Sequence, residues 1–516
     1  MDRNPCSSTA FWRAITLCGI VVYLAFGLVY LLMGQLNADE GWYLYASHLV
    51  YQGKLPYRDF AYTQTPLLPY VYGLVQMLPG SRLYLGRMTS YVLSGVNLAL
   101  CISIARRLSG SRAAALTTLF CATFVYGIYF TVIVKTYALV STCFLLTHAI
   151  LSSRIPDHLK YPLGALLAVL SSVTRLSAAA FAAVIVLHCI IQAPKLARIV
   201  ILCQCVTIVA VALAWTLPAW EAAQWNLLGH HLGQWGGLDV VARIRHNLTD
   251  RIPGLLYWFL PYWLLGTSLV VVSVVSRNTR AVALRYIRGN PQSGVILVGL
   301  GLFAAAHLVT GGFHAEYFVP AIIGALPLLS AILVKLHDST QPKEGPHRWL
   351  ETWKRPLLEI TFLCCLILQP AQHAQAQLDL SGGALPISEV QDLSHHVAQL
   401  TEETDEVLAL EALWIPVEAH RSTPPGMTMA QFSYQSMETA KAEELGVVND
   451  EILAEYLDHR MPKAVILTEL DFRMLRWSPC WYDMEDALSE GYVLTMEREL
   501  FGQWKASVRV YLRSEE

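Results

Sequence analysis

Charged residues are scarce in this 516-residue sequence, which contains only 15% of them against 54% hydrophobic residues. Soluble domains carry about 25% charged residues, so the composition excludes an ordinary soluble enzyme. Charge of one sign is not in excess either, because the formal net charge is −2. The electrostatic pattern of a nucleic-acid-binding protein is therefore missing. The composition predicts a multi-pass membrane protein.

Motifs of several soluble chemistries are also missing. The hydrophilic region from residue 371 has no Gly-rich phosphate loop, no zinc-ligand spacing and no nucleophile turn of the G-x-S-x-G type. The eleven cysteines show no paired redox spacing, and most lie in apolar runs, where a thiol acts as a small hydrophobic group. We therefore expect no disulfide framework, no required metal and no cofactor.

Apolar runs of spanning length are abundant. A membrane helix needs roughly 20 apolar residues, and cytoplasmic loops are enriched in Lys and Arg, which together predict about eleven spans. The predicted spans are 14–33, 84–105, 113–131, 136–152, a hairpin of two short helices over 161–192 broken near Arg175, 199–219, 255–276, 292–311, 317–335 and 356–370. The basic loops then face the cytoplasm together with the N-terminus, and residues 35–83 lie outside.

From residue 371 the composition becomes that of a soluble domain. Strand-like segments are found at 406–413, 463–470, 492–500 and 507–513, with amphipathic segments typical of helices at 388–400 and 449–459. We divide the chain into a membrane domain, 1–370, with a candidate catalytic outer loop, 35–83, and an extracytoplasmic α/β domain, 371–516. The sequence indicates no function for the second domain.

Residues 38–70, ADEGWYLYASHLVYQGKLPYRDFAYTQTPLLPY, concentrate acids, aromatics and prolines. Asp39 and Glu40 follow the first span directly, and Asp59 lies further along the same loop. Two acids near a helix N-terminus are often only solvated charges that the helix dipole favours. A loop that only joins two spans needs few residues, however, so this long segment favours chemistry at the membrane surface.

The segment DEGWYLYASHLVYQGKLPYRDF, followed by PLLPY, resembles the first outer loop of the GT-C glycosyltransferases. The bacterial relatives of protein O-mannosyltransferases and the aminoarabinose-lipid A transferases are the most similar members. The resemblance implies an α-helical polytopic GT-C-like fold in the plasma (inner) membrane. It also implies transfer of a monosaccharide from a polyprenyl-phosphate carrier, at the outer face, to a hydroxyl of a glycan, lipid or protein.

Such a transfer needs a base for the proton of the acceptor and cations for the departing phosphate. Asp39 is the predicted base, and Glu40 would orient it or raise its pKa as a neighbouring like charge. Asp59 is the second predicted catalytic acid; the alternative for Asp59 is a simple ion pair with Arg58 or Lys54.

Arg87 lies early in the span after the loop, where a charge is costly and indicates function unless it snorkels to the interface. The resemblance implies that Arg87 binds the donor phosphate, and Arg175 is a second candidate. The segment GGFHAEYFVPA, residues 311–321, resembles a GT-C segment whose basic residue faces the carrier phosphate. It adds His314 to the predicted phosphate ligands, with Glu316 and Tyr317 as substrate contacts.

Tyr43 and Gln64 complete the predicted substrate contacts. Gln64 stands where related transferases often have Lys or His, so the charge for the phosphate must come from elsewhere in this chain. Lys135 reads as an ordinary interfacial lysine. His230 and His231 are adjacent but lack carboxylates at a defined spacing, so they do not predict a metal site.

Two other functions are compatible with the sequence. A transporter or flippase of lipid-linked sugars would place ionisable residues near the bilayer midplane, in broken helices and often in two related halves. Here the acids lie at one face, and no internal repeat is evident. A non-catalytic protein of envelope assembly would instead use the C-terminal domain as its working part.

Overall fold

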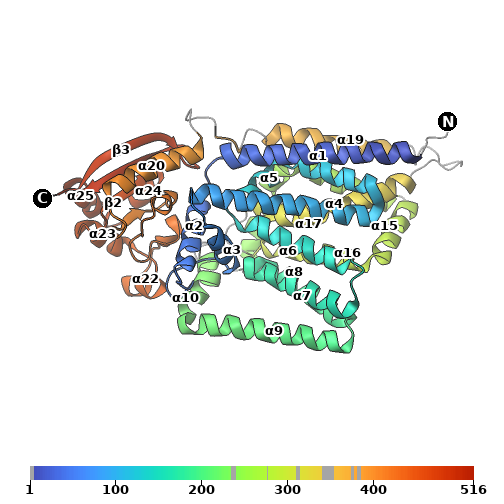
Figure 1. The fold of residues 1–516 in the computed structure, drawn as a ribbon, viewed down its shortest axis with the longest axis horizontal. Coiled ribbons are helices and arrows are strands. Elements are labelled where there is room, and N and C mark those ends of the chain that lie inside the picture. Colours follow the sequence, from blue (N-terminus) through green and yellow to red (C-terminus); the bar gives the residue numbers. More distant parts are fainter. Residues whose placement is uncertain are drawn as a thin grey trace.

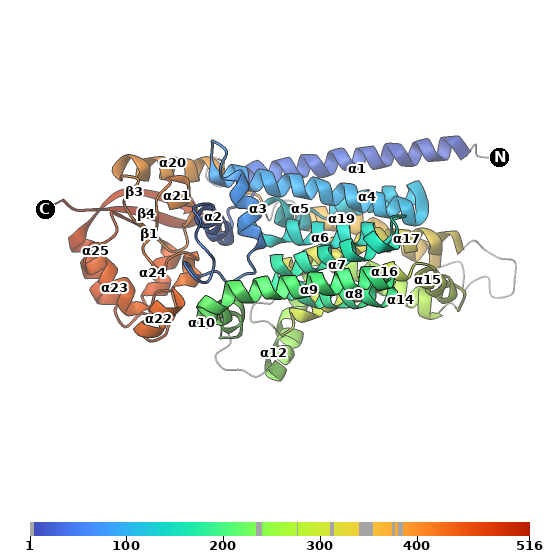
Figure 2. The ribbon, with the colours of Figure 1, turned by 60° about the horizontal axis from the view of Figure 1, so that its bottom comes forward.

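The computed structural model describes residues 5–233, 240–275, 277–309, 314–339, 354–373, 377–379 and 385–515. Long helices lie side by side in a bundle, and a smaller α/β domain sits at one end of it (Figure 1). Helices α2 and α3 lie between the bundle and this domain (Figure 1, Figure 2). The predicted catalytic loop is therefore at the junction of the two parts.

The bundle contains α1 (Pro5–Met33), α4 (Arg82–Thr123), α5 (Val125–Val132), α6 (Thr136–Leu151), α7 (Asp157–Thr174), α8 (Ala179–Gln192), α9 (Lys195–Thr216), α14 (Leu260–Val275), α15 (Arg277–Gly289), α16 (Pro291–Ala306), α17 (Val319–Ser339) and α19 (Lys354–His373). The shorter helices are α2 (Ala38–Tyr51), α3 (Leu67–Val75), α10 (Trp220–Gln224), α11 (His230–Gly233), α12 (Val240–His246) and α13 (Ile252–Trp258). The structure thus confirms a helical protein with a small C-terminal sheet.

Four helical stretches among the described residues are long and apolar enough to cross a membrane: Thr9–Met33, Arg82–Thr123, Lys195–Gly229 and Ala315–Asp338. The bent pair α5 and α6 would add a fifth. Only 11% of the apolar window of Lys195–Gly229 is buried in the protein. Such an exposed apolar surface requires lipid around it. The protein is therefore an integral membrane protein, and the predicted number of about eleven spans stays a prediction.

The apolar runs are interrupted where the sequence places turns. Helix α4 loses helical backbone angles at Ser109 and Gly110, between the predicted spans 84–105 and 113–131. The run 161–192 breaks at Arg175, whose φ of −152° and ψ of 124° are extended, as the predicted hairpin requires. Helices α5 and α6 meet at an angle of 107°. The last residues of the predicted span 292–311 lie outside the described ranges.

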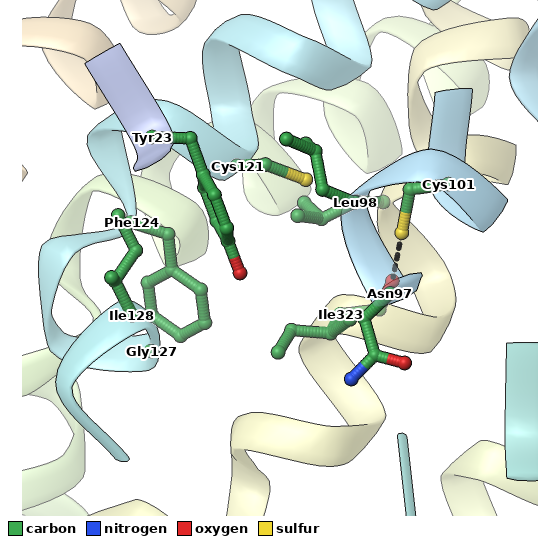
Figure 3. A pocket seen from close by; sticks show the side chains of 10 residues that line it. Tyr23, Asn97, Leu98, Cys101, Cys121, Phe124, Gly127, Ile128 and Ile323 are labelled. Atoms are coloured by element: carbon green, nitrogen blue, oxygen red, sulfur yellow. Dashed lines mark hydrogen bonds between the residues drawn. The ribbon is translucent and has the colours of Figure 1, made fainter. Parts of the chain in front are cut away.

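Polar side chains inside the bundle bond to one another. Tyr23 Oη lies 2.6 Å from Ser94 Oγ, which lies 2.9 Å from Thr131 Oγ1. Figure 3 shows Tyr23 beside a small gap that is also bordered by Cys101, whose Sγ donates to the Ile323 carbonyl at 3.6 Å. The gap measures about 10 Å³. A single water needs at least this much, so the gap is a packing feature and no ligand site.

The C-terminal domain is built on a four-stranded sheet of order β1-β2-β4-β3. Its elements are α20 (Pro386–Leu400), β1 (Val407–Ala409), α21 (Trp414–Glu418), α22 (Thr439–Leu445), α23 (Asp450–Asp458), β2 (Ala464–Thr468), α24 (Glu469–Leu475), α25 (Trp481–Gly491), β3 (Tyr492–Phe501) and β4 (Ala506–Arg513). Strands β1 and β2 are parallel, and β4 is antiparallel to β2 and β3. All four strands and both helices predicted from the sequence are present.

The two faces of the sheet have different partners. Alternate residues of a strand point to opposite faces. Leu408 and Val465 pack with α22 to α25, whereas Val407 and Ile466 belong to a core that also contains α20, α21 and the outer-loop residue Trp42. One hydrophobic core therefore joins the C-terminal domain to the candidate catalytic loop.

Polar contacts fix the same interface. The Ala38 amide at the start of α2 donates to Gln503 Oε1 at 3.0 Å. The Thr423 amide donates to Tyr45 Oη at 2.9 Å. Helix α2 approaches α21 so closely that a Cβ on Gly41 would lie 3.0 Å from the Trp414 nitrogen. The domain whose function the sequence left open thus positions the helix that carries Asp39 and Glu40.

Two carboxyl groups are buried where the parallel strands β1 and β2 end. Glu411 and Asp471 lie within 2.8 and 3.0 Å of the Thr468 hydroxyl, respectively. Burial raises the pKa of Glu411 to about 7 and the pKa of Asp471 to about 6. Both pKa values exceed those of the unfolded chain, so the folded state binds protons more tightly. Their contribution to stability is present at about pH 4 and is lost as the pH rises to about 7.

Replacing Glu411 by glutamine is expected to reduce this loss. Because glutamine stays neutral, the variant should be more stable than the wild type by about 1–3 kcal/mol at pH 8, with a much smaller difference at pH 4. Unfolding curves recorded from pH 4 to pH 8 measure the effect, and the exposed Glu443→Gln provides the control. Equal pH dependence in the Glu411→Gln variant and the wild type would show that Glu411 does not titrate as argued.

Candidate active site

The first turn of α2 places its two acids by a local capping arrangement. Asn37 is the N-cap, and its side chain accepts the Asp39 amide at 3.2 Å. The backbone amide of Asn37 donates in turn to Glu40 Oε2 at 3.2 Å. Such a capping box satisfies free amides at a helix start, where negative charge is also favourable. Asp39 and Glu40 are adjacent in sequence, but their carboxylates have different partners.

Glu40 forms a buried ion pair with Arg87. Arg87 Nε lies 2.9 Å from Glu40 Oε1 and a terminal nitrogen lies 2.6 Å from Oε2, and both side chains are 0% exposed. The remaining guanidinium hydrogens point to the carbonyls of Gly34 and Gln35 at 2.9 and 3.0 Å. Glu40 also accepts the Val134 amide at 3.0 Å. This geometry leaves Arg87 no free face for a phosphate and Glu40 no contact with substrate, so it does not support the site roles predicted for them.

Asp39 faces a second cation. Lys135, at the bend between α5 and α6, lies 2.9 Å from Asp39 Oδ2 and 3.6 Å from Glu316 Oε1. The Asp39 side chain is 27% exposed, whereas that of Lys135 is 5% exposed. Burial raises the pKa of Asp39, but the Lys135 ammonium outweighs burial and holds that pKa below its ordinary value. Asp39 is therefore a permanently negative group at neutral pH.

Arg175 lies at the break between α7 and α8. One terminal nitrogen donates to Thr136 Oγ1 at 3.1 Å, and the guanidinium carbon lies 4.5 Å from the centre of the Tyr317 ring. Arg175 is 8% exposed. Its Nε is buried and donates to no acceptor in the described part of the chain. The Arg175 guanidinium thus has an N–H group that can still donate to a ligand, whereas all three nitrogens of Arg87 already donate to Glu40 or to backbone carbonyls.

Arg175 and Tyr317 border a cavity of about 230 Å³, here called the outer chamber. The other residues that line it are Gln64, Leu176, Ser177, Leu227, Leu228, His231, Ala306, His307 and Val309. They come from the outer loop, the α7–α8 junction, the segment after α10 and the end of α16. Among the predicted site residues, Gln64, Arg175 and Tyr317 are therefore brought together.

An apolar groove of about 540 Å³ adjoins the outer chamber. Helices α3, α7 and α9 line it, with Tyr70, Leu170 and Trp215 among the contributing side chains. Leu176 and Leu227 border both the groove and the outer chamber. The outer chamber, which is bordered by a guanidinium and two imidazoles, and the long apolar groove thus lie next to each other, an arrangement that matches an amphiphile with a polar head and an apolar tail.

The other predicted residues have varied surroundings. Asp59 pairs with Arg58 at 2.8 Å and accepts the Leu55 amide at 2.7 Å, which corresponds to the alternative of a local ion pair. Tyr43 is 3% exposed and stacks on Trp42, with ring centres 3.8 Å apart. His314 is exposed, and its ring centre lies 5.3 Å from that of Tyr317. Asp59 is not among the residues that border the outer chamber.

Lys135 and His231 were not among the predicted site residues, but the structure places Lys135 against Asp39 and His231 at the outer chamber. Lys135 interrupts an apolar run, and a charge in such a run is a signal of function that applied to it as much as to Arg87. His231 Nε2 lies 2.8 Å from the Thr63 carbonyl, which is 168 residues away in sequence. Nothing local in the sequence indicates that contact.

The bundle, its outer loop and the appended α/β domain together have the GT-C fold, as the resemblance over residues 38–70 predicted. The crystal structure of ArnT from Cupriavidus metallidurans bound to undecaprenyl phosphate aligns with a TM-score of 0.58 and 13% identity, over 97% of this chain and 98% of ArnT. The apo form of the same protein gives a TM-score of 0.59 and 13% identity, over 98% of both chains. An oligosaccharyltransferase from Archaeoglobus fulgidus gives 0.45 and 11% identity, over 98% of this chain and 74% of its own.

The likeness does not extend to sequence comparison. No protein-family profile matches this chain. No curated protein matches it by sequence either. The shared property is therefore the fold, and the function must be argued from the site.

Proposed function

We propose that this protein transfers a monosaccharide from a polyprenyl-phosphate carrier to a hydroxyl acceptor. The observation that supports the proposal is the apolar groove beside a chamber that is bordered by a buried guanidinium, with Leu176 and Leu227 lining both. A groove bordered by lipid-facing helices suits an isoprenoid chain, and a guanidinium suits a phosphate because it donates two parallel hydrogen bonds. The fold likeness to ArnT, solved with undecaprenyl phosphate, supports the same class of ligand.

The reaction is a direct displacement with inversion at the anomeric carbon. Arg175 would bind the departing phosphate, and Gln64 and Tyr317 would donate hydrogen bonds to the head group. Lys135 would add positive charge beside the phosphate, assisted by His314. The carboxylate of Asp39, held by Lys135, would stabilise positive charge that develops on the sugar ring. Its low pKa makes Asp39 a weak base, since proton acceptors work best with a pKa near the operating pH.

The charge distribution supports an orientation. The basic helix α15, which carries Arg280, Arg285 and Arg288, lies at the end of the bundle opposite the C-terminal domain (Figure 1). Cytoplasmic loops are rich in Lys and Arg. We infer that this end faces the cytoplasm, and that the outer chamber and the C-terminal domain lie outside the plasma (inner) membrane.

Paired substitutions of two predicted acids test the function. In a purified-protein assay with a panel of polyprenyl-phosphate monosaccharides, the wild type should release polyprenyl phosphate. Asp39→Asn should slow release by about 10²-fold or more, because it removes the carboxylate that stabilises the positive charge developing on the sugar ring. Asp59→Asn should stay within about threefold, since its pair with Arg58 is exposed.

The broken helices at Lys135 and Arg175 favour a transporter of lipid-linked sugars as the second candidate. Its signature in the same experiment would be movement of carrier-linked sugar across liposomes without release of polyprenyl phosphate from any donor. That result would replace the proposed transferase. Equal rates for Asp39→Asn and the wild type would keep the transferase and remove Asp39 from the site.

A further inference from the structure

We propose that His231 is the general base that accepts the proton of the acceptor hydroxyl. The inference rests on the proposed transfer and identifies the group that activates the acceptor. None of the described residues that line the outer chamber is a carboxylate, so the chamber itself offers no acidic side chain as base. Its nitrogen bases are the imidazoles of His231 and His307.

The contact of His231 with Thr63 fixes the state of the imidazole. His231 Nε2 lies 2.8 Å from the Thr63 carbonyl oxygen. A carbonyl can only accept a hydrogen bond, so Nε2 must carry the hydrogen. In the neutral ring the lone pair is then on Nδ1, which is the atom that can accept a proton. The backbone of the outer loop thereby orients the base and selects its tautomer.

Accessibility separates His231 from the other histidines nearby. His231 is half-buried and borders the outer chamber. His307 is 2% exposed, with its ring between Phe303 and Tyr317 at centre distances of 5.1 and 4.8 Å. His230 packs against Trp225 and Phe432 at 5.4 and 5.7 Å and is not among the lining residues. His231 is therefore the imidazole that an acceptor in the chamber can reach.

The surroundings keep His231 neutral at physiological pH. Burial lowers its pKa below 6.5, the Arg175 guanidinium lowers it further, and the Thr63 carbonyl raises it in part. Among the described residues, the titratable and charged groups that face it are Arg175 at the α7–α8 junction, His307 at the end of α16, Tyr317 before α17 and its neighbour His230. None of them is an anion that would favour the protonated ring, so His231 is available as a base.

In the proposed step, the acceptor oxygen forms a bond to the anomeric carbon as the bond from that carbon to the phosphate oxygen breaks. The hydroxyl proton passes to His231 Nδ1, and the bonding electron pair leaves with polyprenyl phosphate, which Arg175 stabilises. The proton then moves to the phosphate or to water, which restores the neutral ring. Asp39 keeps its charge throughout.

The test uses glutamine at position 231, since its amide nitrogen can take the place of Nε2 and keep the bond to Thr63 but cannot accept the proton. His231→Gln should lower the transfer rate by about 10²-fold or more. The wild-type rate should fall tenfold per pH unit below an apparent pKa under 6.5, and this limb should vanish in the variant. His230→Gln is the matched control and should keep both rate and pH profile.

Binding of sugar-free polyprenyl phosphate is measured in parallel and separates the two proposals. Unchanged binding with lost transfer in His231→Gln supports the base assignment. The base assignment would be wrong if His231→Gln transferred sugar at the wild-type rate and its rate still fell at acid pH as in the wild type. His231 would then only hold the Thr63 carbonyl in place. Failure of the wild type to bind polyprenyl phosphate or to cleave any carrier-linked sugar would instead overturn the proposed function.

Discussion

Arg175→Gln is expected to weaken binding of polyprenyl phosphate by about 10²-fold, since a charged hydrogen bond to a buried phosphate contributes about 2–3 kcal/mol. Arg175 is the guanidinium that borders the outer chamber, and its buried Nε has no acceptor within the described ranges. Glutamine keeps a hydrogen-bond donor and removes the charge. Binding of labelled polyprenyl phosphate to the purified protein measures the loss.

The control for this substitution is Arg198→Gln. Arg198 is exposed near the start of α9 and bonds to the Ala193 carbonyl at 3.3 Å, away from the residues that line the chamber. Its loss should leave binding within about twofold, because exposed charges contribute little. Equal binding by Arg175→Gln and the wild type would move the phosphate site elsewhere.

Arg87→Met is expected to destabilise the protein by about 3–5 kcal/mol, because it leaves the carboxylate of Glu40 buried without its cation. Both side chains are 0% exposed, and the guanidinium also ties α4 to the carbonyls of Gly34 and Gln35. Denaturant unfolding in detergent measures the loss. The double variant Glu40→Gln and Arg87→Met should recover part of it, since no net charge is then left uncompensated.

The same variant decides between the two roles considered for Arg87. A structural role predicts that the fraction of Arg87→Met that remains folded binds polyprenyl phosphate as the wild type does. If Arg87 contacts the phosphate, binding by the folded fraction should fall while stability changes little. The second outcome would contradict the ion pair as the main role of this residue.

Local signals account for the parts of the fold that the sequence predicted. The acids Asp39 and Glu40 lie in the first turn of α2, where acids near a helix N-terminus are favoured, and the strand-like segments correspond to all four strands of the C-terminal domain. Arg175 in a long apolar run marked the break between α7 and α8. Each of these features depends on neighbours in sequence, so a single sequence is enough to find them.

The candidate site could be predicted only in part, because its contacts join distant segments. The sequence selected Gln64, Arg175 and Tyr317, which border the outer chamber, and Asp39 and Glu316, which both lie near Lys135. It could not show that the Arg87 guanidinium is paired with the carboxylate of Glu40, which is 47 residues away. It also treated Asp59 as a catalytic acid, and in the structure Asp59 pairs with its neighbour Arg58.

By itself, the sequence determined that this is a membrane protein with a short-range acidic motif after its first span, because hydropathy and helix capping act over a few residues. Tertiary structure alone decided that Arg175 borders the outer chamber and that Asp39 pairs with Lys135. It also decided that His231 meets Thr63 across 168 residues and that Gln503 reaches Ala38 across 465. Such contacts form only when helices and domains pack, and side-chain spacing along the chain does not encode them locally.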